Sequence, residues 1–214
     1  MRTAIGLALL LSVLLSGVPG TAQIVDYWGF SDFPQTVGSG IVEVGFAIEI
    51  HAPLTYDPEG FQYTYAFEEL MLAEVVPMGP ATVYTYLGGF FNVYEDASFN
   101  ATYDDAQCLV SDPATFTDGS LYLQAELDTL TWIYNSMTGR GSYDAVMTYT
   151  GGTHIDEIPL DCREGMMFGG TTDLSCTVCI PEGYDHRWDG QAFTIQGPSA
   201  VDSSTWGSVK TLFR

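Results

Sequence analysis

The segment Ile41–Ile50 reads IVEVGFAIEI, and its pattern decides the fold class. Its even-numbered positions are all apolar, whereas its odd-numbered positions include Glu43, Gly45 and Glu49. Alternation with a period of two is typical of a half-buried antiparallel strand with one apolar face and one polar face. We therefore expect the even-numbered side chains to face a core and the two glutamates to face solvent.

The same alternation recurs along the chain, between segments that carry turn residues such as Asp57-Pro58-Glu59-Gly60. No convincing amphipathic helix interrupts it. Many short strands separated by turns predict an all-β fold, a single antiparallel β-sandwich or jelly roll. The further strand-like runs are Phe61–Phe67, Thr82–Leu87, Phe90–Glu95, Leu121–Leu127 and Tyr143–Tyr149.

The N-terminus has the features of a secretory signal peptide. Arg2 precedes the apolar run Ala4–Leu15, and Gly20-Thr21-Ala22 provides small residues for cleavage. The run is shorter than the roughly 20 apolar residues that span a bilayer. We expect residues 1–22 to be removed, residues 23–214 to form one domain, and the product to be secreted without membrane insertion.

The charge is almost all of one sign. The chain has 6 Lys+Arg against 27 Asp+Glu, a formal net charge of −21. Phosphate backbones are bound by Lys and Arg, so this balance excludes nucleic acid as a partner. Hydrophobic residues make up 46% of the chain, which predicts a folded domain rather than a disordered acidic one.

Four cysteines follow the signal peptide: Cys108, Cys162, Cys176 and Cys179. An even number in an exported chain predicts disulfides. Three pairings are open, and we favour Cys162 with Cys176 or Cys179 because they are near in sequence. A zinc site formed by the Cys176-x-x-Cys179 pair with Cys162 and His154 is the alternative, disfavoured because export promotes cysteine oxidation.

The stretch from Tyr94 to Gly119 is rich in acidic residues, and calcium prefers carboxylate and carbonyl oxygens supplied by loops. The spacing fits no fixed calcium-binding template. The favoured interpretation is that these side chains cap turns in a solvated loop, and calcium binding is the alternative hypothesis. The candidate ligands are Glu95, Asp96, Asp104, Asp105, Asp112 and Asp118.

No catalytic residue is assigned. The three histidines are not accompanied by a Gly-x-Ser-x-Gly motif, and no catalytic carboxylate pair can be selected among the 27 acidic residues. Trp188 and Trp206 lie in polar, Gly-flanked sequence. We expect them to be the exposed tryptophans, where such rings can stack on sugars.

Three segments together resemble exported β-rich proteins of environmental bacteria, many of which carry a PEP-CTERM sorting tail. They are Phe90–Asp96, Asp112–Leu123 and Ile180–Gln191. The resemblance implies a cell-surface or extracellular-matrix setting and no established catalytic activity. The C-terminal segment Trp206–Arg214 has no such sorting tail, which favours release from the cell or retention by another route.

Three functions are therefore compared. The first is a secreted, non-catalytic β-sandwich protein with a cell-surface or matrix role and a glycan or matrix partner. The second is a carbohydrate-binding or carbohydrate-cleaving jelly-roll domain with structural calcium. The third is a small outer-membrane β-barrel, which the chain length and the alternation also fit.

Overall fold

The computed structural model describes residues 20–34, 36–173 and 179–196. The main compact unit is Gln23–Phe193, and a second unit comprises Met1–Ala22 and Thr194–Arg214. Residues 1–19 of the predicted signal peptide lie outside the described residues. The described part of the chain contains twelve β-strands and three short 3-10 helices, and no α-helix.

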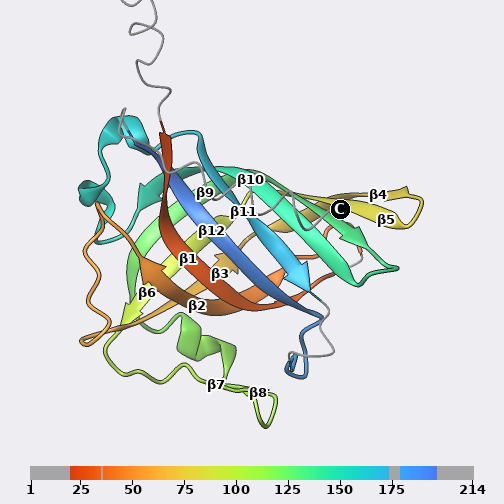
Figure 1. The fold of residues 1–214 in the computed structure, drawn as a ribbon, viewed down its shortest axis with the longest axis horizontal. Coiled ribbons are helices and arrows are strands. Elements are labelled where there is room, and N and C mark those ends of the chain that lie inside the picture. Colours follow the sequence, from red (N-terminus) through yellow and green to blue (C-terminus); the bar gives the residue numbers. More distant parts are fainter. Residues whose placement is uncertain (1–19, 35, 174–178, 197–214) are drawn as a thin grey trace, which may run out of the picture. The chain divides into compact units, whose positions relative to one another are not determined.

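The strands follow the alternating runs of the sequence and are shown in Figure 1. They are β1 (Gly20–Asp32), β2 (Val42–Ile50), β3 (Gln62–Glu68), β4 (Met71–Met78), β5 (Ala81–Leu87), β6 (Phe90–Asp96), β7 (Tyr103–Asp104), β8 (Leu109–Val110), β9 (Ser120–Asn135), β10 (Arg140–Gly151), β11 (Met166–Asp173) and β12 (His186–Gln196). The 3-10 helices are η1 (Pro113–Phe116), η2 (Ile155–Glu157) and η3 (Leu160–Cys162).

The main sheet closes on itself. Its order is β10-β11-β12-β1-β2-β3-β6-β9-β5-β4, and β9 also pairs with β10. Eight strands therefore form a closed antiparallel ring, and the β4–β5 hairpin extends from it along β9 (Figure 1). The all-β prediction is confirmed. In place of the two facing sheets of the expected sandwich, however, one sheet is rolled into a barrel.

The length of β9 explains how the barrel and its extension share one sheet. One edge of this 16-residue strand pairs with β10 from Gln124 to Asn135. The other edge pairs first with β6 and then, from Thr129 to Asn135, with β5. Strands of a sandwich and of a barrel alternate in the same way, so alternation alone does not distinguish the two architectures.

Aromatic side chains fill the barrel. Tyr27 packs with its ring centre 4.9 Å from that of Tyr65 and 5.1 Å from that of Phe168. Glycines on β2 and β12 leave room for aromatic rings, because a Cβ at Gly45 would overlap the Tyr65 ring and one at Gly190 would overlap the Tyr143 hydroxyl. The interior is thus a packed core.

Strand β2 is oriented opposite to the sequence prediction. Glu43 and Gly45 face the barrel interior and are buried. Val44 and Phe46 face outward, where Phe116 and its neighbours cover them. The prediction that Glu43 faces solvent was wrong because an additional layer of chain covers the outer face, so both faces of this strand are buried near its centre.

The other alternating strands agree better with the sequence. Tyr143, Ala145, Met147 and Tyr149 of β10 are all buried, and Tyr63, Tyr65 and Phe67 of β3 are buried as predicted. At the ends of β2, Val42 and Ile48 are each 49% exposed although they belong to the predicted core face. No helix among residues 20–34, 36–173 and 179–196 is long and apolar enough to cross a membrane.

Candidate functional site

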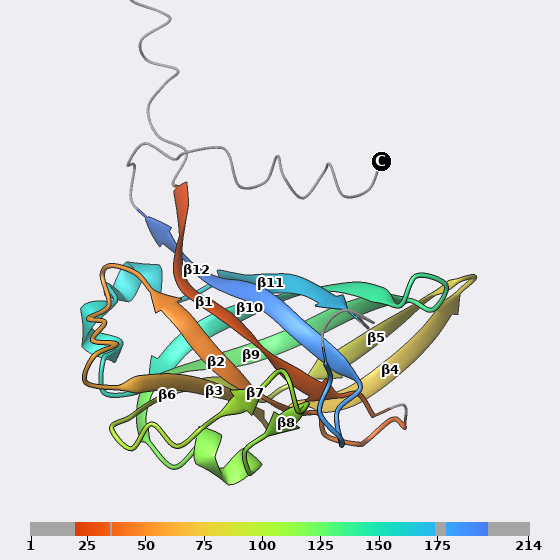
Figure 2. The same cartoon turned by 60° about the horizontal axis from the view of Figure 1, so that its bottom comes forward.

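The outer layer on β2 and β3 is the segment 97–119 between β6 and β9, here called the cover segment. It contains β7, β8 and η1, and it lies against the outer side of β2 and β3 in Figure 2. The Phe116 carbonyl accepts a hydrogen bond of 2.7 Å from the Thr64 hydroxyl. The Gln62 amide binds both the N–H and the carbonyl of Ala101. These contacts fix the cover segment on the barrel.

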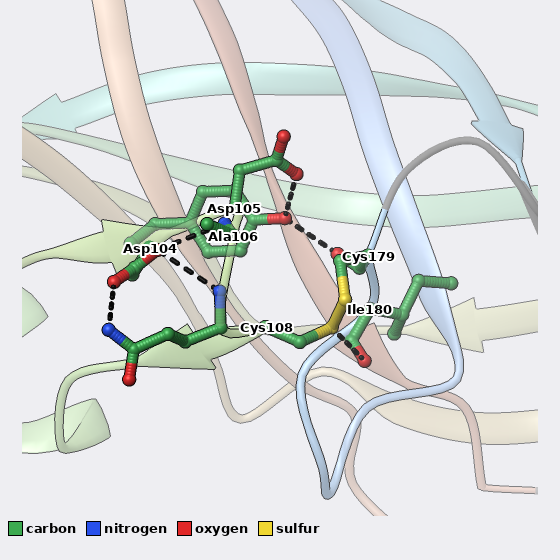
Figure 3. Close-up of a disulfide and its surroundings, with 8 residues drawn as sticks. Asp104, Asp105, Ala106, Cys108, Cys179 and Ile180 are labelled. Carbon is green, nitrogen blue, oxygen red and sulfur yellow. Dashed lines mark hydrogen bonds between the residues drawn. A yellow bond between two sulfur atoms is a disulfide. The ribbon is translucent and has the colours of Figure 1, made fainter.

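A disulfide fastens the far end of the cover segment. Cys108 bonds to Cys179, with their Cα atoms 5.2 Å apart and a sequence separation of 71. The Tyr103 hydroxyl lies 2.7 Å from the Cys179 carbonyl and 3.0 Å from Asp105 Oδ1 (Figure 3). Burial is the main cause that raises the pKa of Tyr103 to about 12, and the neighbouring Asp105 carboxylate adds to this increase.

This bond confirms that the cysteines form a disulfide and corrects the Cys162–Cys179 pairing, whereas the other favoured pairing, Cys162 with Cys176, stays a prediction. Cys162 is not the partner of Cys179, because folding of the cover segment brings Cys108 to that position. Cys179 is also no thiolate ligand in this structure, so the zinc alternative loses one ligand. Cys176 lies outside the described residues.

Between the cover segment and the outer side of β1–β3 lies an open groove of about 470 Å³. Grooves of this size hold small organic ligands. None of the described residues that line it is charged. Its walls are mainly aromatic rings, contributed by Trp28, Phe46, Tyr56, Phe61, Phe99 and Tyr103.

The rings of the groove support one another. The Trp28 ring centre lies 5.1 Å from that of Phe46 and 5.6 Å from that of Tyr103. The guanidinium carbon of Arg187 lies 5.0 Å from the Trp28 ring centre, in a cation–π contact. These contacts hold the rings of Trp28, Phe46 and Tyr103 in place, so the groove is preformed.

Phe99 is the exposed ring of the groove. Its side chain is 46% exposed, and its φ of 52° lies in the left-handed region. A bulky residue other than glycine seldom adopts this conformation, which costs about 1–2 kcal/mol. The surrounding hydrogen bonds of the cover segment hold the residue there, and the strained backbone presents an apolar ring at the rim.

The acidic residues of the cover segment mostly serve its turns. Asp104 Oδ1 accepts hydrogen bonds from the N–H groups of Ala106 and Gln107, and Oδ2 accepts one from the Gln107 side chain. Asp112 caps η1 through the Ala114 N–H. These contacts match the turn-capping interpretation.

The remaining calcium candidates point to different partners. Asp118 accepts from the Asn100 side chain, Asp105 lies beside the Tyr103 hydroxyl, and Asp96 accepts from the Ser98 N–H. Glu95 lies 3.7 Å from His154 Nε2. Within the residues that the structure describes, no three His, Cys, Asp or Glu side chains are grouped to hold a metal ion. Calcium binding stays a prediction.

Sequence reasoning missed the carboxyl group inside the barrel. Glu43 is 1% exposed, its Oε1 accepts a 2.7 Å hydrogen bond from the Tyr65 hydroxyl, and its Oε2 has no hydrogen-bond partner in the described structure. Burial raises the pKa of Glu43 well above its ordinary value. Nearby, the Tyr27 and Tyr143 hydroxyls are 2.7 Å apart. The sequence held one signal that this face of the strand points inward. Gly45 lies on the same face as Glu43, and a glycine there leaves space for a large ring.

A second polar cluster surrounds His154. Its Nδ1 lies 3.0 Å from Glu157 Oε1, and the Tyr122 ring stacks on it at 4.3 Å. Glu157 also accepts hydrogen bonds from the Thr55 N–H and hydroxyl. Burial tends to raise the pKa of Glu157, but the hydrogen bonds from His154 and Thr55 outweigh it and lower the pKa. The cluster joins two loops, which is a structural role.

The predicted exposed tryptophan is buried. Trp188 is 0% exposed and packs inside the barrel, with its ring centre 3.9 Å from that of Tyr143. It faces inward because it alternates with Arg187 and Asp189 along β12. Trp206 lies outside the described residues. Trp28, which no sequence signal singled out, is the tryptophan that lines the groove.

Comparison with protein-family models, with curated proteins and with solved structures gave no match. The groove and its aromatic walls therefore provide the basis for a functional proposal.

Proposed function

We propose that this chain is an exported, non-catalytic binding domain that holds a neutral saccharide in its aromatic groove, at the cell surface or in the extracellular matrix. The observation that carries the proposal is the preformed groove with half-exposed rings from the barrel and the cover segment. Aromatic faces stack on the apolar C–H faces of sugar rings while the sugar hydroxyls stay in water.

Charge supports a neutral ligand. The groove has no charged lining residue among those described, and the chain as a whole carries a net charge of −21. Anionic ligands are repelled by such a field and find no Lys or Arg to bind in the groove. A neutral saccharide avoids that repulsion and gains from stacking.

The strained Phe99 supports a binding role for the rim. Residues held in sparsely populated backbone conformations concentrate at ligand-binding and other functional sites. The backbone of Phe99 is strained, and its large ring is exposed beside the groove. Full burial would instead stabilise that ring by about 1.5–3 kcal/mol. A ligand that covers the ring recovers part of this energy.

Export is supported by two independent features. The N-terminal segment has the pattern of a signal peptide. The Cys108–Cys179 disulfide is of the kind that persists in oxidising compartments. A surface or matrix role further agrees with the resemblance to exported β-rich bacterial proteins.

A glycan array probed with the purified protein tests the proposal. We expect binding to a set of neutral glycans, reduced at least roughly tenfold, or about 1.4 kcal/mol, by Phe99→Ala. Leu109→Ala is the matched control, because Leu109 is also exposed on the cover segment but does not line the groove. Silence across neutral glycans, or equal losses in both variants, would refute the proposal.

The alternatives have separate tests. Turnover of a polysaccharide in a hydrolase screen would replace the non-catalytic proposal with the carbohydrate-cleaving one. If the chain without its signal peptide stays in solution only in detergent, the outer-membrane alternative is favoured. A higher melting temperature in calcium than in EDTA would support the calcium hypothesis, because a bound ion stabilises the folded state by mass action.

A further inference from the structure

Two separate groups of aromatic rings line the groove. Trp28, Phe46 and Tyr103 form one group, in which the rings contact one another. The loop between β2 and β3 contributes the other group, Tyr56 and Phe61. Within the described part of the chain, no ring-to-ring contact joins the two groups. The hollow that both groups line therefore lies between them, and a ligand held there meets aromatic surface from both.

Most polar side-chain groups of the lining are engaged by the protein itself. The Tyr56 hydroxyl donates a 3.0 Å hydrogen bond to the Ile48 carbonyl. The Tyr103 hydroxyl lies 2.7 Å from the Cys179 carbonyl, and the Gln62 amide binds a backbone N–H and a backbone carbonyl of the cover segment. These groups position the walls of the groove and leave the ring faces to a ligand.

Few polar groups of the groove are available to a sugar hydroxyl. The Tyr63 hydroxyl accepts a hydrogen bond from the Asp57 N–H, and the Tyr63 side chain is buried. The indole N–H of Trp28 and the hydroxyl of Thr102 make no hydrogen bond with the residues that the structure describes. Contact with the ring faces therefore has to provide most of the binding free energy, and hydrogen bonds only a small part of it.

We propose that the groove selects β-linked chains of pyranose units whose hydroxyls are all equatorial, as in the gluco configuration. This inference rests on the saccharide-binding function proposed above and adds the configuration of the sugar. Equatorial hydroxyls project from the edge of the sugar ring, so both faces of the unit present only C–H groups. Such a unit can contact both groups of aromatic rings at once while its hydroxyls stay in water.

An axial hydroxyl opposes this mode of binding. It places an oxygen on one face of the sugar ring, as in mannose and galactose. Against an aromatic ring that hydroxyl loses its contact with water, and the lining offers few groups to replace the lost hydrogen bond. The cost of one such unpaired group corresponds to roughly fivefold to hundredfold weaker binding.

The predicted selectivity is moderate because the groove distinguishes sugars by shape. A site built on hydrogen bonds to a substrate hydroxyl rejects the analogue without that hydroxyl by roughly ten-thousandfold or more. Apolar sites discriminate by about a hundredfold at most. We therefore expect the gluco chain to bind roughly tenfold more tightly than its epimers, which also bind measurably.

Tyr56 offers a matched pair of variants, because its ring lines the groove while its hydroxyl is bound to the Ile48 carbonyl. Tyr56→Phe keeps the ring and should bind the gluco chain within roughly twofold of the parent affinity. Tyr56→Ala removes the ring and should weaken binding at least roughly tenfold. Thermal melting followed by circular dichroism shows whether each variant is folded.

Calorimetric titration with β-linked oligosaccharides of glucose, mannose and galactose, matched in length and linkage position, tests the inference. We expect the glucose chain to bind most tightly. Equal affinities for the three chains, or equal losses in Tyr56→Phe and Tyr56→Ala, would overturn the inference and leave saccharide binding intact. Binding of other neutral glycans on the array but none of these three would also overturn it alone, whereas silence across the array would remove the proposed function as well.

Discussion

Glu43 and Tyr65 share a 2.7 Å hydrogen bond inside the closed barrel, on two neighbouring strands. The bond satisfies one carboxyl oxygen of Glu43 and leaves the other without a partner in the described structure. A protonated carboxyl group fits this environment far better than a carboxylate, because an unpaired charge away from water is expensive. The barrel core thus contains an ionisable group whose neutral form stabilises the fold.

The first prediction follows from the pKa of Glu43. The contribution of this residue to the free energy of unfolding should fall as pH rises. Burial raises this pKa above the ordinary value of 4.5, so the folded chain binds more protons than the unfolded chain above that pH. The stabilisation is complete below about pH 4.5 and is lost as pH rises through the folded pKa. The loss approaches about 1.4 kcal/mol per pH unit for one group.

Glu43→Gln removes this contribution, because an amide keeps a hydrogen-bonding group but does not ionise. Urea unfolding at several pH values should show a flatter pH dependence for Glu43→Gln than for the parent above pH 4.5. Glu126→Gln is the control, since Glu126 is exposed on β9. The same slope in the parent and in Glu43→Gln would contradict the assignment.

The alternating runs predicted the strands well but could not predict how they are assembled. In β10 the buried residues were the expected ones, and Asp144 and Val146 between them are exposed. In β2 the cover segment buries the face that a simple barrel would leave to solvent, so the apolar positions belong to an outer layer and Glu43 faces inward. Local alternation contains no information about such a layer.

The groove was equally hard to predict. Trp28 and Tyr103 are far apart in sequence, and each lies in an ordinary strand pattern. They meet because the Cys108–Cys179 bond and the Tyr103 hydroxyl hold the cover segment against the barrel. The cysteines were recognised as disulfide partners from the exported character of the chain, but the pairing depends on tertiary structure.

Removal of the disulfide is expected to lower both stability and saccharide binding. Cys108→Ser should reduce the free energy of unfolding by about 2–4 kcal/mol, because the bond closes a long loop. The cover segment then holds the groove wall less firmly. Chemical denaturation and saccharide titration measure the two effects.

A double variant provides an internal check on this bond. Cys108→Ser combined with Cys179→Ser should lose no more stability than Cys108→Ser alone, since both changes remove the same bond. Additive losses would show that the two cysteines have separate partners. A tryptic map of the unreduced protein should contain the linked pair of peptides.

Phe99→Gly is expected to separate stability from binding. Glycine adopts a positive φ at little steric cost, so the substitution relieves strain worth about 1 kcal/mol and removes a ring that is 46% exposed. The unfolding free energy should stay the same or rise, whereas saccharide binding should fall. A marked loss of stability would show that the ring is a packing element rather than a ligand contact.

The most direct test of the central claim is a calorimetric titration of the parent and of Phe99→Ala with the strongest neutral glycan from the array. We predict saturable binding by the parent and at least roughly tenfold weaker binding by Phe99→Ala, with Leu109→Ala indistinguishable from the parent. Equal affinity in all three proteins, or no heat of binding in the parent, would contradict the assignment of the groove as a saccharide site.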